Sequence, residues 1–141
     1  MRHDRQDTIS RDALLLAMEY RAAAEEDLYC VEKMREDCFE SPHNACMLAA
    51  RASEKFIKSK LLLTGADFSW IHDQTTLVNL FGDFDRKERA IEIAAQLSIY
   101  AINANYPSSV RTHIGREEAS DAYDMLIEMI DIIRPYDVDS E

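Results

Sequence analysis

The sequence predicts an all-α protein, folded as an up-and-down four-helix bundle with one additional short helix between the second and third long helices. Only 3 glycines and 3 prolines interrupt the 141 residues, which favours long helices over many turns. Apolar residues recur every three or four positions along the long segments. A chain of this length buries roughly 68% of its unfolded surface, enough for one core. We therefore expect a single helical domain over residues 1–141, with residues 1–7 and 135–141 flexible.

The best-marked helix runs from Ser41 to Gly65. Ser41 suits the N-cap, Pro42 the first helical position, and Gly65 the C-terminal stop. Apolar residues occupy most of its circumference: Ala45, Cys46, Leu48, Ala49, Ala50, Ala52, Phe56, Ile57, Leu61 and Leu63. Such a helix must contact several others, so we expect it at the centre of the bundle.

The same periodicity predicts the remaining helices: Thr8 to Asp37, a short helix from His72 to Phe81 that ends at Gly82, Arg86 to Pro107, and Gly115 to Ile133. The short helix is expected to turn Leu77, Leu80 and Phe81 inward. The first helix carries more apolar residues than one buried stripe needs, namely Leu14, Leu15, Met18 and Tyr20. This surplus predicts a homodimer.

The formal net charge is -11, so the chain should repel nucleic acids in bulk and anionic membranes. No apolar run approaches the roughly 20 residues needed to span a bilayer. The three cysteines, Cys30, Cys38 and Cys46, form an odd set that predicts free buried or half-buried thiols in a reducing compartment. We expect a cytoplasmic protein.

A charged stripe interrupts the apolar surface of the central helix at Arg51, Glu54, Lys55 and Lys58. Glu54 and Lys58 stand at the i,i+4 spacing that favours a surface ion pair. One interpretation is therefore a solvated face. The other is a local positive patch that binds a nucleotide, a phosphate group or an acidic partner.

Candidate metal and cofactor motifs are weak. His72 and Asp73 resemble a metal-binding dipeptide but lack further ligands, and a helix start is favoured. Cys38, His43 and Cys46 could approach one another, yet no fourth zinc ligand is evident. The aromatic residues Phe68, Trp70 and Phe81 are interpreted as core rather than as a platform for a base. We expect no metal and no cofactor.

Five motifs, in this order, resemble the HEPN family of small four-helix prokaryotic domains. They are AEEDLYCVEKM at Ala24 to Met34, the kernel Ala52, Ser53, Glu54, Lys55 and Lys58, the pair His72–Asp73, the pair Tyr106–Pro107, and EEA at Glu117 to Ala119. The resemblance extends from Ala24 to about Ile133. Departures occur at Ala50 and Arg51, where the family pattern tends to have glutamines, and at Asn105, where it tends to have arginine.

HEPN ribonucleases resemble one another in an Arg followed four to six residues later by His, and this sequence has no such pair. Other HEPN proteins are non-catalytic companions of a small nucleotidyltransferase, in toxin–antitoxin pairs among others. The resemblance therefore implies a binding subunit, without catalytic residues, that partners a nucleotidyltransferase. A ribonuclease with Arg111 and His113 as a degenerate motif is one alternative. A helical interaction protein without a ligand is another.

Overall fold

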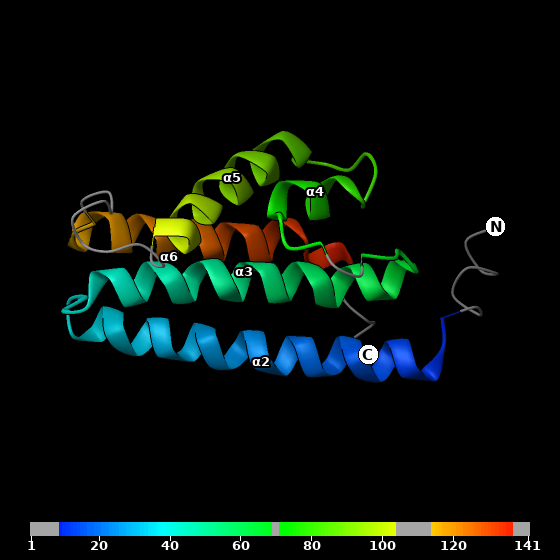
Figure 1. Ribbon diagram of the computed structural model, residues 1–141, viewed down its shortest axis with the longest axis horizontal. Coiled ribbons are helices and arrows are strands. Elements are labelled where there is room, and N and C mark those ends of the chain that lie inside the picture. The colour runs from blue at the N-terminus through cyan, green and yellow to red at the C-terminus, as the bar shows by residue number, and fades with distance from the viewer. Residues whose placement is uncertain (1–8, 69–70, 104–113, 137–141) are drawn as a thin grey trace.

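The computed structural model describes residues 9–68, 71–103 and 114–136, with the side chains of residues 102 and 103 excluded. These residues form helices and no strand, as predicted. Long helices α2 (Arg11–Glu36), α3 (Pro42–Thr64), α5 (Lys87–Asn103) and α6 (Arg116–Ile132) are accompanied by the short α4 (Gln74–Asn79) and a 3-10 helix, η1 (Arg134–Tyr136). The long helices alternate in direction, and α5 crosses the others obliquely (Figure 1). The four-helix bundle with an additional short helix is thereby confirmed.

Helix α3 lies at the centre of the bundle, as predicted. It contacts α2, α4, α5, α6 and η1. Pro42 occupies its first turn, and Gly65 ends it in the left-handed conformation, with φ 82°. Glycine adopts this conformation without the steric cost that a Cβ imposes. The N-cap differs from expectation, because the Ser41 hydroxyl makes no bond to the helix backbone and instead accepts one from Asn44 Nδ2 at 3.2 Å.

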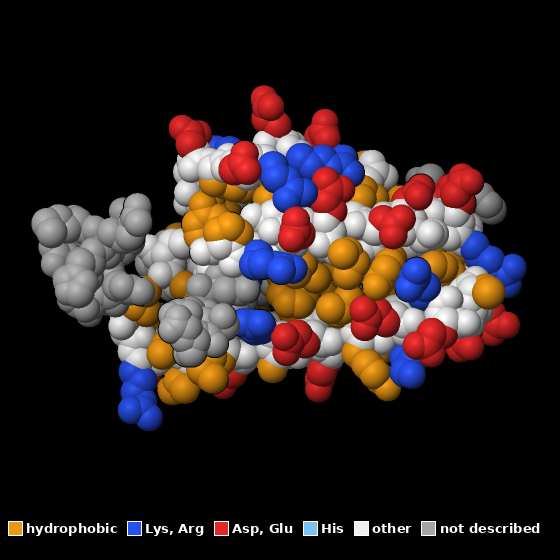
Figure 2. All heavy atoms as spheres, turned by 180° about the vertical axis from the view of Figure 1, so that it is seen from behind, with side chains coloured by type: hydrophobic (Ala, Val, Ile, Leu, Met, Phe, Trp, Pro, Cys, Tyr) orange, Lys and Arg blue, Asp and Glu red, His pale blue; other side chains and the backbone are white. Residues whose placement is uncertain are grey.

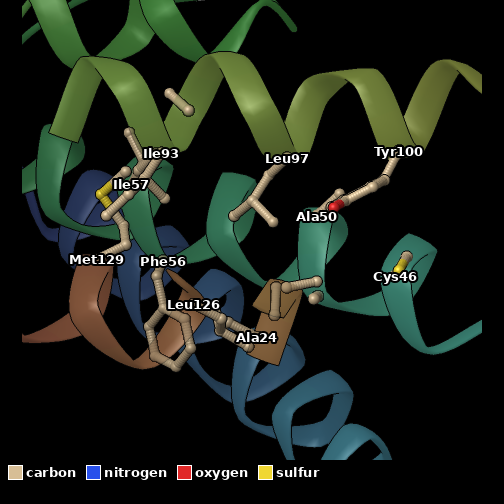
Figure 3. Close-up of a cluster of buried hydrophobic side chains, with 14 of the residues drawn as sticks. Ala24, Cys46, Ala50, Phe56, Ile57, Ile93, Leu97, Tyr100, Leu126 and Met129 are labelled. Atoms are coloured by element: carbon tan, nitrogen blue, oxygen red, sulfur yellow. The ribbon is translucent and has the colours of Figure 1, made fainter. Parts of the chain in front are cut away.

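Both sides of α3 are packed (Figure 3). Phe56 points toward Leu126 of α6 and Ala24 of α2, whereas Ala50 lies near Leu97 of α5. All of these side chains are at most 5% exposed. Alanines on α3 permit close helix approach, and the fully buried ones are Ala45, Ala49 and Ala52. The apolar circumference of α3 therefore reflects burial between helices on two sides.

Helix ends and the short helix differ in detail from the prediction. Helix α2 begins after Ser10, whose hydroxyl accepts a hydrogen bond from the Ala13 N–H at 3.0 Å; Thr8 lies outside the described residues. Helix α4 is shorter than expected, and Leu80 follows it with 39% of its surface exposed, so its inward placement is wrong. Residues 135 and 136, expected to be flexible, belong to η1. The Tyr136 ring packs 4.5 Å from that of Phe81.

Ion pairs connect α5 to α6 at the surface. Arg89 donates to both carboxylate oxygens of Glu128 at 2.9 Å, and Arg86 donates to Asp131 at 2.9 Å. The Arg89 hydrogen bond lowers the pKa of Glu128. Seen from behind, charged side chains lie across the upper part of the molecule, above a band of hydrophobic side chains (Figure 2).

Among the described residues, no helix combines the length and the apolar character of a membrane span.

Candidate functional site

Lys58 of α3 is buried, with 6% of its surface exposed. Burying an ammonium group is costly unless polar partners replace its water. Its Nζ donates to Glu54 Oε2 at 2.8 Å and lies 3.3 Å from Nδ1 of His72. The predicted i,i+4 pair is thus present, but the expectation of a solvated stripe is wrong at Lys58. The cause is tertiary, because segments outside α3 cover this position.

His72 completes a triangle with Glu54 and Lys58. Its Nδ1 lies 3.2 Å from Glu54 Oε2, while most of its ring faces solvent. This nitrogen accepts from Lys58 when it carries no hydrogen and donates to Glu54 when it carries one. The three groups therefore form one small electrostatic unit at the surface of α3.

A buried glutamine fixes the segment that carries His72. Gln74 is 2% exposed; its Oε1 accepts from Ser53 Oγ at 2.8 Å, and its Nε2 donates to the Ala50 carbonyl at 2.9 Å. Asp73 occupies the N-cap position of α4, as predicted, but its carboxylate accepts from the hydroxyls of Thr75 and Thr76, which lower its pKa. Gln74 is therefore the anchor between α4 and α3.

Replacing Gln74 with leucine should lower the free energy of unfolding by about 1–3 kcal/mol, because the Ser53 hydroxyl loses its buried acceptor. Urea denaturation of the variant measures this change. The matched control is Gln96→Leu, at an exposed position of α5. Equal midpoints for Gln74→Leu and Gln96→Leu would contradict the anchoring role.

Two aromatic rings flank the Lys58 ammonium. Tyr20 comes from α2 and Phe68 follows α3; their centroids lie 6.3 Å apart in an edge-to-face arrangement. Lys58 Nζ lies 5.9 Å from the Tyr20 centroid and 5.8 Å from that of Phe68, within cation–π range. Phe68 is buried, in agreement with the core interpretation, whereas Trp70 lies outside the described residues.

Two hollows meet at Tyr20 and Lys58. The first, of about 320 Å³, has mainly apolar walls and is lined by Leu16, Tyr20, Lys58, Leu62, Ala66, Asp67, Phe68 and His72. The second, of about 400 Å³, has charged walls and is lined by Tyr20, Arg51, Glu54, Lys55 and Lys58. All four residues of the predicted stripe thus line one hollow. We call the two hollows together the Lys58 site.

The lysines of this site are paired with carboxylates. Lys55 Nζ lies 2.8 Å from Asp27 Oδ2 of α2, and Lys58 binds Glu54. Arg51 is exposed. The site therefore has less net positive charge than the residues of α3 alone predict, because α2 contributes the carboxylate of Asp27. An anion that reaches Lys58 must compete with Glu54.

Other sequence candidates have separate outcomes. Arg111 and His113 lie outside the described residues, as does the pair Tyr106–Pro107. All three cysteines are free, as predicted, although Cys30 and Cys38 are exposed rather than buried. Burial raises the pKa of the Cys46 thiol to about 12. Within the described ranges, no three His, Cys, Asp or Glu side chains group closely enough to hold a metal ion.

Comparison with protein families matches the HEPN domain over residues 17–136. The chain belongs to the HEPN family. No curated protein and no solved structure shows a significant match to it. The HEPN match extends from the second turn of α2 to the end of η1 and includes Tyr20, Lys58 and His72. Every residue that lines the Lys58 site except Leu16 therefore lies within the matched HEPN domain.

Proposed function

We propose that this HEPN-domain chain is a non-catalytic binding subunit that takes a nucleotide or phosphate group at the Lys58 site and partners a small nucleotidyltransferase. The observation that supports ligand binding is the buried ammonium of Lys58, which lies in the wall shared by the two hollows. The nucleotidyltransferase partner rests on the sequence resemblance and on the missing Arg–His spacing. A cytoplasmic location and a toxin–antitoxin context belong to the same proposal.

The two hollows offer different chemistry. Phosphate oxygens accept hydrogen bonds from ammonium and guanidinium groups, which Lys58 and Arg51 supply on the charged side. A base gains from contact with aromatic and aliphatic surface, which Tyr20 and Phe68 supply on the other. A ligand that bridges the hollows would thus place its phosphate above Arg51 and its base beside Phe68.

The charge balance favours a ligand with few phosphates. The three cations Arg51, Lys55 and Lys58 are matched in number by three carboxylates, those of Asp27, Glu54 and Asp67, so the site has no excess of positive charge. A triphosphate would bring more negative charge than these groups can offset, on a chain whose net charge is already -11. We therefore propose a mononucleotide or inorganic phosphate as the preferred ligand class.

Calorimetric titration with AMP and with inorganic phosphate tests this proposal. Lys58→Met should weaken AMP binding by at least about tenfold, because a hydrogen bond to a charged group contributes roughly 1.5–3 kcal/mol. Glu54→Gln should tighten it, because the competing carboxylate is removed. Lys33→Met, at an exposed position of α2, is the matched control and should leave affinity unchanged. No AMP or phosphate binding at millimolar concentration would favour the helical protein without a ligand.

Catalysis is tested separately. The purified chain, incubated with RNA, should leave it intact. Cleavage that disappears in His113→Ala would overturn the non-catalytic role and favour the ribonuclease alternative with Arg111 and His113.

A further inference from the structure

A carboxylate lines the apolar hollow of the Lys58 site. It belongs to Asp67, which follows α3 in the chain and precedes the buried Phe68. Asp67 is exposed, so its carboxylate lies at the rim of the hollow. A carboxylate repels a phosphate group, so Asp67 opposes an anionic ligand unless it contacts a different part of that ligand. Its position in the apolar hollow indicates contact with the base.

The walls of this hollow suit the flat faces of a base. Tyr20 and Phe68 supply aromatic rings, and Leu62 adds aliphatic surface. The volume of about 320 Å³ falls within the roughly 300–1,000 Å³ of small-molecule pockets. Stacking on such walls is available to every base, because every base has a π-face. Selection among the bases must therefore come from the charged and polar groups of the hollow.

Asp67 is the charged group of this hollow that lies outside the triangle of Glu54, Lys58 and His72. Lys58 Nζ and His72 Nδ1 both contact Glu54 Oε2, at 2.8 and 3.2 Å. An ionised carboxylate has about four lone-pair positions and no donor, so Asp67 can accept from a ligand in addition to partners within the chain. The base that fits best is therefore one that presents N–H donors at its edge.

Guanine is the base whose edge matches a carboxylate. Its N1–H and its 2-amino group stand side by side and can donate to the two oxygens in parallel, which is the geometry of strong bidentate pairs. Adenine and cytosine each place one amino donor beside a ring nitrogen that accepts, and uracil places its N–H between two carbonyls. These bases would leave one oxygen of Asp67 opposite another acceptor, which is repulsive.

We propose that Asp67 makes the apolar hollow selective for guanine, so that the preferred ligand of the site is GMP. The selectivity rests on the proposed binding of a nucleotide at the Lys58 site and specifies its base. The phosphate lies on the charged side near Arg51, the base stacks beside Phe68, and its donor edge meets Asp67. A site that hydrogen-bonds one group of a ligand rejects analogues that lack it.

Calorimetric titration of the full chain with GMP, AMP and IMP tests the selectivity. GMP should bind about tenfold more tightly than AMP, because a bidentate pair distinguishes one base from another by at least this factor. IMP keeps the N1–H but lacks the 2-amino group, so its affinity should fall between the two. Equal affinities for GMP and AMP would overturn the selectivity and leave the proposed function standing. Binding of none of the three nucleotides would overturn both.

Asp67→Asn tests the residue itself. The amide offers one donor and one acceptor, which match the edge of adenine, so the variant should prefer AMP to GMP. Asp83→Asn removes the same charge from a fully exposed position and should keep the wild-type preference. The ratio of GMP to AMP affinity is the readout, because a change in net charge affects both nucleotides alike. An unchanged ratio in Asp67→Asn would overturn the proposal.

Inorganic phosphate separates selectivity from folding. It lacks a base, so its affinity should not fall in Asp67→Asn, since Arg51 and Lys58 are intact. Loss of phosphate binding in this variant would assign Asp67 a structural role and overturn its role in choosing the base.

Discussion

Replacing Leu97 with alanine is expected to lower the free energy of unfolding by about 3 kcal/mol. Leu97 is fully buried on α5 and points into the core between α5 and α3 (Figure 3). Removing its branched side chain loses apolar burial and leaves a cavity that neighbouring helices only partly fill. Denaturant unfolding followed by circular dichroism measures the difference.

Ile99→Ala provides the matched control on the same helix. Ile99 is 48% exposed, and the substitution removes as many carbon atoms as Leu97→Ala. Its cost should be well below that at Leu97, since surface substitutions usually change stability by about 0.5 kcal/mol or less. Equal losses at both positions would show that the orientation of α5 differs from the one described.

Replacing Lys60 with methionine is expected to raise the free energy of unfolding by about 1–3 kcal/mol at pH 7. Lys60 is 4% exposed, and burial lowers the pKa of its ammonium from 10.5 to about 8. One pKa unit corresponds to about 1.4 kcal/mol. The folded chain therefore bears the cost of a buried charge that methionine, with a similar length and no charge, does not impose.

The pH dependence of this gain has a definite sign. Below pH 8 the Lys60 ammonium is charged in both the folded and the unfolded chain, so the full cost is present. Between pH 8 and 10.5 the folded chain releases the proton while the unfolded chain retains it, and wild-type stability rises relative to the variant. The advantage of Lys60→Met should therefore shrink across this window. Lys33→Met, which removes a lysine charge from an exposed position, is the matched control.

The helices and the central place of α3 were predictable because their causes are local. Pro42 fits a first turn, Gly65 tolerates a positive φ, and apolar residues at helical spacing mark the faces that must be buried. The HEPN resemblance was likewise carried by short motifs, and the family match over residues 17–136 confirms it. The bounds of α4 were placed less accurately, because the helix predicted from His72 to Phe81 is observed over Gln74–Asn79.

Whether the charged residues of α3, Arg51, Glu54, Lys55 and Lys58, are solvated or enclosed was decided only by the tertiary structure. Nothing in the spacing of Glu54 and Lys58 indicates that Tyr20, Phe68 and His72 enclose them, because these residues come from α2 and from the segment between α3 and α4. Asp27, likewise, neutralises Lys55 from another helix. Periodicity along a helix predicts which residues face outward from that helix; it does not predict what the neighbouring segments place against them. That is why Lys58 is buried beside Glu54 and His72 instead of solvated.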